Sequence, residues 1–247
     1  MIDLHTHTVW SDGRDTAEEM IQEALGRGMT CIGISDHSFA EWDDAAMPRD
    51  SVHAYRREIS RLKAAYDGKI EVLCGLERDY YSGDQLEYDY VIGSVHAMRM
   101  ENGHHVCVDW TPERLERDCA TFFGGDWYAL CEAFYRLEAD VVRRTKCDII
   151  GHFDLVTKFN EARRWFDPAH PRYRAAWQAA ADQLLKTGKL FEINTGAMSR
   201  GYRTDAYPAR EIRDYLRSAG ARLILSSDAH RKEHLAFAFD RFAAEQE

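Results

Sequence analysis

Seven short apolar runs, separated by longer amphipathic segments, are the feature that most constrains the fold of this 247-residue chain. The runs lie at residues 2–4, 31–35, 70–74, 90–95, 148–151, 190–193 and 222–227. Strands that are apolar throughout are typical of parallel sheets whose faces are covered by helices. Because most runs are followed by a helical pattern, the sequence predicts an α/β fold, either a barrel or a doubly wound sheet.

The segments between the runs carry the sequence patterns of helix ends. Thr16 and Glu19 form a predicted capping box, and Gly28 is the predicted stop of that first helix. Further helices are predicted at 52–66, 112–146 with a break near 124–125, 173–186, 208–218 and from 233 onward. The stretch 97–110 is the least regular. No linker divides the chain, so a single domain over residues 1–247 is expected.

Charge and hydropathy argue against several classes of function. The formal net charge of −10 disfavours nonspecific binding to nucleic acid or to an anionic membrane. The chain has no run of about eighteen apolar residues, and therefore no predicted membrane span. It also shows no basic and apolar leader, which favours a cytoplasmic location. No residue pattern indicates an oligomeric state.

Polar residues that can bind metal ions follow almost every apolar run. His5 and His7 come first, and because they lie two residues apart on an extended chain, they point to the same side. The later runs end at Asp36 with His37, Glu77, His96, His152, Asn194, and Asp228 with His230. In a βα barrel these strand ends form one face, where active sites are built. A single histidine is more often a partly buried structural residue, but six of the 11 histidines at one position of the fold predict a shared site.

The residue types favour metal ions in a hydrolytic role. Imidazoles and carboxylates without thiolates suit zinc, manganese or iron, and they do not suit a structural zinc site. The set is too large for one ion, and a carboxylate such as Glu77 can bridge two ions. Clustered divalent ions lower the pKa of a shared water and hold a phosphoryl oxygen. The sequence therefore predicts a hydrolytic centre with more than one ion.

A series of short motifs resembles those of the PHP (polymerase and histidinol phosphatase) superfamily. The motifs lie at 5–7, 11–13, 35–37, 75–77, 93–96, 151–152 and 227–230. The resemblance implies a distorted (β/α)7 TIM-like barrel with its active site at the C-terminal ends of the strands. It also implies three divalent metal ions, Zn, Mn or Fe. Their ligands would be His5, His7, Glu77 and Asp228 for one ion, Glu77, His96 and His152 for the second, and Asp12, His37 and His230 for the third.

Two acidic residues have alternative roles: Asp12 belongs to this ligand set, and Asp36 lies beside it. Asp12 lies in Ser11-Asp12-Gly13, where its alternative role is that of a turn residue, and some relatives place a histidine there. Asp36 precedes His37 and is expected to orient an imidazole instead of binding an ion.

Residues 152–160 and 191–197 resemble the histidinol-phosphate phosphatase branch of that superfamily. The resemblance implies a phosphomonoesterase that hydrolyses L-histidinol phosphate, a step of histidine biosynthesis. A metal-bridging hydroxide would attack phosphorus, and Arg200 would offset charge on the phosphoryl oxygens. Asp228 or a metal-bound water would protonate the leaving alkoxide. Asp228, Arg200 and His230 are therefore the catalytic candidates.

The candidates for binding the small phosphorylated substrate are Arg200, Lys158, Arg163, Asn194 and Ser94. Arg200 is favoured because a guanidinium can hold a phosphate with two hydrogen bonds. Arg163 is alternatively a solvated residue at a helix start, and Asn194 alternatively ties down its own loop. Because 97–105 resembles the family less than its flanks do, another small phosphomonoester or a nucleotide stays open as the substrate. A metal-binding PHP module without activity is the remaining alternative.

Overall fold

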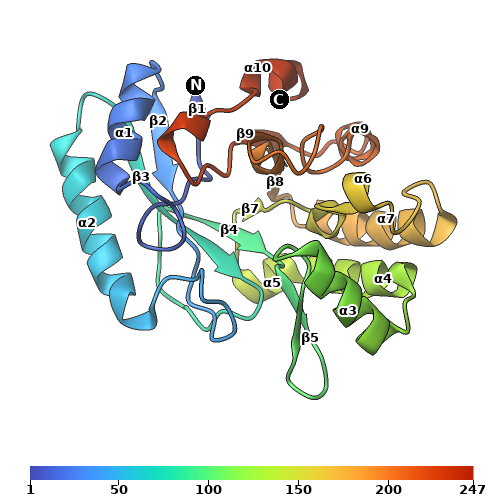
Figure 1. Cartoon of the computed structure of the whole chain (residues 1–247). Coiled ribbons are helices and arrows are strands. Elements are labelled where there is room, and N and C mark those ends of the chain that lie inside the picture. Colours follow the sequence, from blue (N-terminus) through green and yellow to red (C-terminus); the bar gives the residue numbers. More distant parts are fainter. Residues whose placement is uncertain (247) are drawn as a thin grey trace.

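The computed structural model describes residues 1–246 and is built around a seven-stranded parallel sheet (Figure 1). The strands are β1 (Ile2–Asp3), β2 (Cys31–Ile34), β3 (Glu71–Asp79), β4 (Tyr90–Ser94), β7 (Ile149–Ile150), β8 (Leu190–Asn194) and β9 (Leu223–Ser226). They lie side by side in chain order, and each neighbouring pair is parallel. The seven predicted strands are therefore confirmed.

The sheet curls until its first and last strands meet. Just beyond β1 and β9, Thr6 forms a parallel bridge with Ala229. The His7 amide donates to the Ala229 carbonyl (2.8 Å), and the Ala229 amide donates to the His5 carbonyl (3.2 Å). These hydrogen bonds make the sheet a nearly closed, distorted TIM-like barrel. The barrel is confirmed, and the doubly wound sheet is excluded.

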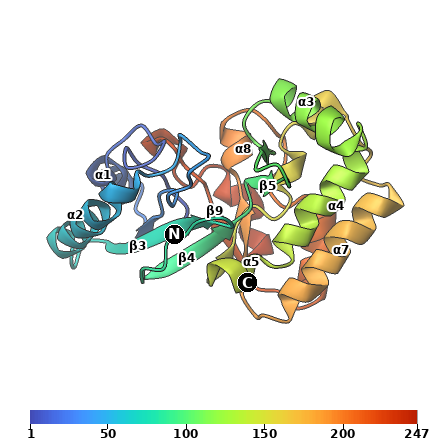
Figure 2. The same cartoon turned by 90° about the horizontal axis from the view of Figure 1, so that it is seen from below.

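Helices cover the outside of the barrel on two sides. They are α1 (Ala17–Gly26), α2 (Val52–Ala65), α3 (Pro112–Phe123), α4 (Trp127–Glu138), α5 (Val141–Thr145), α6 (Asn160–Arg163), α7 (Pro171–Leu185), α8 (Gly196–Ser199), α9 (Arg210–Ser218) and α10 (Phe239–Phe242). Figures 1 and 2 show α1 and α2 on one side of the strands and α3, α4 and α7 on the other. The capping box predicted at Thr16 and Glu19 is confirmed. Within residues 1–246, none of the helices combines the length and the apolar character needed to cross a membrane.

Three segments differ from the prediction. Strand β3 continues to Asp79, so Glu77 lies inside a strand and not after it, because pairing with β4 extends to the end of β3. The stretch predicted as irregular contains an antiparallel hairpin of β5 (Ala97–Arg99) and β6 (His105–Cys107). The helix predicted from 233 is limited to the short α10 and two 3-10 turns, at Lys232–His234 and Ala243–Glu245. It is interrupted because Ala236 adopts a left-handed φ of 51° and donates its amide to the Asp3 carboxylate (3.0 Å).

The interior of the barrel is filled below the polar strand ends by a small apolar cluster. Tyr90 is its largest member, and the Tyr90 hydroxyl reaches across the barrel to donate to the Leu4 carbonyl. The ring has room because Gly33 and Gly75 on the neighbouring strands have no side chain. A Cβ atom added at Gly33 would lie 2.0 Å from the Tyr90 hydroxyl oxygen, and one at Gly75 would lie 2.3 Å from the ring. The two glycines thus allow one tyrosine to support the floor of the site.

We expect Gly33→Ala to lower the free energy of unfolding by about 2–3 kcal/mol, because a buried ring must move to admit the new methyl group. Gly26→Ala is the matched control. A Cβ at Gly26 meets nothing within 4 Å, and the residue has helical φ, so it should be neutral or stabilising by up to about 1 kcal/mol. Urea unfolding followed by circular dichroism measures both. Equal unfolding midpoints for the two variants would contradict the proposed packing.

Candidate metal centre

The C-terminal ends of the strands bring the predicted ligands to one end of the barrel. His5 and His7 follow β1, His37 follows β2, and Asp228 and His230 follow β9. Closure of the barrel at Thr6 and Ala229 places the first and the last of these residues beside each other. His96 and His152 follow β4 and β7 in the same way. Residues more than 220 positions apart in the sequence therefore share one site because parallel strands end on the same face.

Glu77 lies at the centre of this group and is buried. Its two carboxylate oxygens approach the ring nitrogens of five imidazoles: His37 (2.8 Å), His152 (2.9 Å), His5 (3.3 Å), His96 (3.3 Å) and His7 (3.6 Å). The Ser94 hydroxyl donates to the same carboxylate (2.6 Å). Burial would raise the pKa of Glu77, but the imidazoles of His37, His5 and His96 hold it well below its usual range. Glu77 is therefore an ionised carboxylate that can contact more than one ion.

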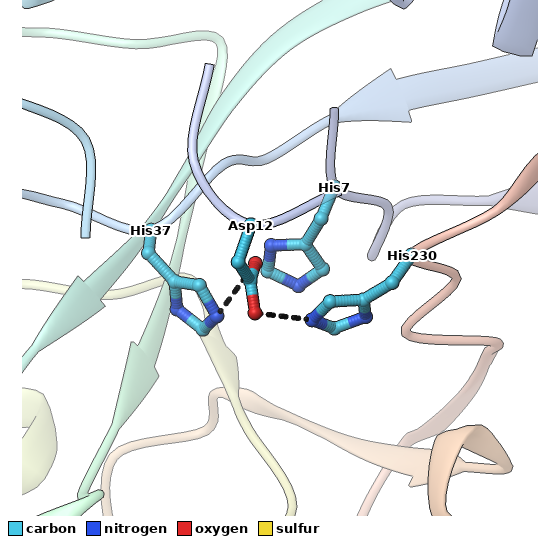
Figure 3. Close-up of side chains that lie close together, drawn as sticks. All are labelled: His7, Asp12, His37 and His230. Atoms are coloured by element: carbon cyan, nitrogen blue, oxygen red, sulfur yellow. Dashed lines mark ion pairs between the residues drawn. The ribbon is translucent and has the colours of Figure 1, made fainter. Parts of the chain in front are cut away.

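A second carboxylate, Asp12, lies between His37 and His230 and close to His7 (Figure 3). Its oxygens are 3.1 Å from Nε2 of His230 and 3.6 Å from Nε2 of His37. The His7 ring packs between the other two rings, with centroids 4.2 Å from His230 and 4.3 Å from His37. Asp12 thus points into the cluster, although it belongs to the predicted Ser-Asp-Gly turn.

Asp228 completes the group from the end of β9. Its carboxylate is 3.2 Å from Nε2 of His7 and 3.9 Å from Nε2 of His5. Arg200 donates through Nη2 to the carboxylate of Asp228 and through Nη1 to its carbonyl, both at 3.0 Å. Burial would raise the pKa of Asp228, but Arg200 and the nearby imidazoles hold it well below its usual range.

The donor atoms of this cluster fit divalent metal ions. Nε2 of His5 and both ring nitrogens of His7 are buried and have no hydrogen-bond partner among the described residues. Polar atoms buried in this way are rare and cost stability unless something else satisfies them. Burial, together with the neighbouring His230 and His37 rings, lowers the pKa of His7 to about 3, so the ring is neutral at pH 7 and one of its nitrogens has a free lone pair. Neutral imidazole and ionised carboxylate are the forms that bind metal.

Three overlapping groups have donor atoms within 4.8 Å of one another, close enough to share an ion. They are His7, Asp12, His37 and His230; His5, His7 and Asp228; and His37, Glu77 and His96. These groups resemble the three predicted ligand sets but do not match them fully. His37 replaces His152 beside Glu77 and His96. His7 joins the Asp12 group, and Glu77 is absent from the group of His5, His7 and Asp228.

Two carboxylates that the sequence interpretation missed hold the imidazoles in place. Glu192 Oε2 lies 2.8 Å from Nδ1 of His5, and Asp79 Oδ2 lies 3.3 Å from Nδ1 of His96. A proton on Nδ1 leaves Nε2 free to face the cluster. Glu192 could have been suspected, because it is a charged residue within an otherwise apolar run.

Asp36 has a different role from the predicted one. Its carboxylate accepts hydrogen bonds from the amide and hydroxyl of Thr8 and from the amide and hydroxyl of Ser11, at 2.6–3.2 Å. It therefore orders the turn that carries Asp12, and its side-chain hydrogen bonds within the described part of the chain go to Thr8 and Ser11 and not to an imidazole.

The cluster opens into a pocket of about 160 Å³. Lys158 and Arg200 line it, as predicted, together with Asp109, Leu155 and Tyr202, which were not predicted. Lys158 donates to the carbonyl of Asp109 (2.8 Å). Two cationic side chains therefore face the same space as the candidate metal ligands.

Three predicted substrate-binding residues do not line this pocket. Ser94 is buried and its hydroxyl is bound to Glu77. Asn194 is buried and its side chain accepts from the Gly196 amide (2.8 Å), which agrees with the alternative that it ties down its own loop. Arg163 lies in α6 at the surface, where it pairs with Glu113. Substrate contact by these three residues stays a prediction, and in this structure their polar atoms are directed elsewhere.

Comparison with known proteins places this geometry in context. A model of the PHP domain matches residues 3–196. The chain is 25% identical over 265 residues to the histidinol-phosphatase of Bacillus subtilis, and the match covers 97% of each protein. A solved structure from Listeria monocytogenes has a TM-score of 0.86 at 18% identity, covering 98% of this chain and 100% of the other. Histidinol phosphate phosphatase from Lactococcus lactis, solved with Zn, L-histidinol and phosphate, has a TM-score of 0.70 at 20% identity and covers 99% of this chain and 91% of its own.

We expect Glu192→Gln to weaken binding of Zn²⁺ by about 10- to 100-fold, because the amide no longer fixes the proton of His5 on Nδ1. Competition with a chromophoric chelator measures the affinity. Glu71→Gln is the control, since Glu71 is exposed at the opposite end of β3. If both variants bind Zn²⁺ as the unmodified protein does, Glu192 does not orient a ligand.

Proposed function

The chain belongs to the PHP domain family, and on this premise we propose that it is a metal-dependent phosphomonoesterase that hydrolyses L-histidinol phosphate to L-histidinol and phosphate. One observation carries the proposal: buried imidazoles and carboxylates face the same pocket as Lys158 and Arg200. Metal ligands beside two cations suit a phosphate ester. The likeness to histidinol phosphatases, one of them solved with L-histidinol and phosphate, supports this substrate.

We propose three divalent ions for this site, zinc, manganese or iron, in line with the three overlapping groups of donor atoms. The proposed ligands are His5, His7, Asp12, His37, Glu77, His96, His152, Asp228 and His230. Divalent ions at such a site make water a stronger nucleophile and polarise phosphoryl oxygens. The metal identity follows from availability as much as from ligand type.

The remaining polar residues of the pocket bind and orient the substrate. We propose that Lys158 and Arg200 offset the charge of the phosphate, because both line the pocket. Nε of Arg200 is buried and has no hydrogen-bond partner within the described part of the chain. Arg200 also keeps Asp228 ionised, so we assign Asp228 to ligand binding in preference to proton donation. His230 lies between Asp12 and the Asp228 carbonyl and stays the candidate for proton transfer.

We also propose that residues 1–247 form a single domain; residue 247 lies outside the described residues. The predicted cytoplasmic location and the predicted lack of nucleic-acid binding stay predictions.

We expect the purified protein to release phosphate from L-histidinol phosphate, to lose this activity with a strong chelator, and to regain it with Zn²⁺ or Mn²⁺. His7→Ala should lower kcat/KM by at least about 100-fold, because it removes a donor shared by two groups, and Arg200→Ala by a similar factor. Arg143→Ala is the control for loss of a guanidinium, since Arg143 is exposed and, among residues 1–246, pairs only with Asp140. Turnover that resists the chelator would contradict the metal-dependent scheme.

A panel of phosphomonoesters and nucleotides separates the proposed substrate from the alternatives. We expect kcat/KM for L-histidinol phosphate to exceed that for nucleoside monophosphates and sugar phosphates by at least about 100-fold. A site whose polar groups pair with those of one substrate rejects molecules that leave these groups unpaired. A higher value for any other ester would reassign the substrate. Protein that binds metal but hydrolyses no member of the panel would instead be an inactive PHP module.

A further inference from the structure

One carboxylate in the pocket is not engaged with the candidate metal ligands. Asp12, Glu77 and Asp228 each lie within 3.6 Å of imidazole nitrogens. Asp109 is the fourth carboxylate that lines the pocket, and it comes from the chain just after the β5–β6 hairpin. It lies between the motifs at 93–96 and 151–152, so the family motifs assign it no role.

The two oxygens of the Asp109 carboxylate have different surroundings. Oδ2 is 3.8 Å from Nζ of Lys158, and Lys158 makes its hydrogen bond to the backbone carbonyl of Asp109 instead. Oδ1 is buried and lacks a hydrogen-bond partner among residues 1–246. A carboxylate that is mostly buried and lacks a close donor is costly, so a cationic donor from a bound molecule would be favourable at the 21% of the side chain that stays exposed beside the pocket.

We propose that Asp109 binds an ammonium group of the substrate and makes the enzyme selective for phosphomonoesters of 2-amino alcohols. The inference rests on the proposed phosphatase function of this pocket. Lys158 and Asp109 are adjacent, so a phosphate next to Lys158 and a cation next to Asp109 would occupy neighbouring positions. In a 2-amino alcohol phosphate, the carbon that bears the amine is bonded to the carbon that bears the phosphate ester. The ammonium group and the phosphate are therefore close together, as Asp109 and Lys158 are. A carboxylate paired with an ammonium group is a strong, charge-assisted contact.

A competing explanation is that Asp109 only positions Lys158. That role would affect every phosphomonoester to the same extent, because each carries the same phosphate. An ammonium contact affects only substrates that have the amine. The ratio of the kcat/KM values for two substrates, one with and one without the amine, therefore distinguishes the two roles. Activity on a single substrate does not.

The test compares Asp109→Asn with the unmodified metal-loaded enzyme on L-histidinol phosphate and on its deamino counterpart, 3-(imidazol-4-yl)propyl phosphate. We expect the unmodified enzyme to prefer the amino substrate and Asp109→Asn to lower the ratio of the two kcat/KM values by about 30- to 100-fold. Asp109→Glu, which keeps the charge, should retain part of the preference. Lys158→Met should lower both kcat/KM values and change their ratio by less than about threefold. A ratio that is unchanged in Asp109→Asn, or no preference in the unmodified enzyme, would overturn the inference.

Binding of the two alcohols, L-histidinol and 3-(imidazol-4-yl)propan-1-ol, is measured by calorimetry. It tests the ammonium site independently of phosphatase activity. If the enzyme hydrolyses neither phosphate but Asp109→Asn selectively weakens binding of L-histidinol, the proposed function fails and the ammonium site stands. If the enzyme releases phosphate from both esters and the ratio of the two kcat/KM values is the same in all variants, the proposed function stands and the ammonium site fails.

Discussion

The burial of one carboxylate, Glu77, among five imidazoles is the interaction on which the site depends. A charge removed from water is costly unless groups around it compensate, and here the compensation comes from imidazoles that follow four strands, β1, β2, β4 and β7. Glu77 can occupy this position because β3 continues past it and stays paired with β4. The Tyr90 ring, packed against two glycines, forms the floor beneath it. The apolar layer around Tyr90 therefore supports the polar layer that contains Glu77 and the imidazoles.

Closure of the barrel ties the site to the fold. The same short segments that close the sheet, around Thr6 and Ala229, carry His5, His7, Asp228 and His230. Their side chains meet only when the first and last strands meet. Ions that bind these residues would therefore also hold the barrel closed, because metal binding contributes to folding when its ligands come from distant parts of the chain.

The sequence predicted the arrangement of strands and the positions of the metal-competent residues well, because both follow from periodicity. Apolar runs mark buried parallel strands, and a polar residue at the end of each run must lie on one face. Side-chain direction is not encoded in this way. Ser94 and Asn194 have suitable residue types and positions, yet their polar atoms bond to Glu77 and to a neighbouring loop. Asp109 was not predicted because it follows a hairpin and not one of the seven parallel strands. Its place in the pocket depends on how that hairpin packs, which no local sequence pattern indicates.

The most direct measurement is anomalous X-ray diffraction from crystals of the metal-loaded protein, recorded on both sides of the absorption edge of the bound metal. We expect anomalous peaks bonded to both carboxylate oxygens of Glu77, with imidazoles from several strand ends completing each coordination shell. Peaks confined to the surface, or a Glu77 carboxylate that contacts no ion in fully loaded and active protein, would contradict a hydrolytic metal centre built around Glu77.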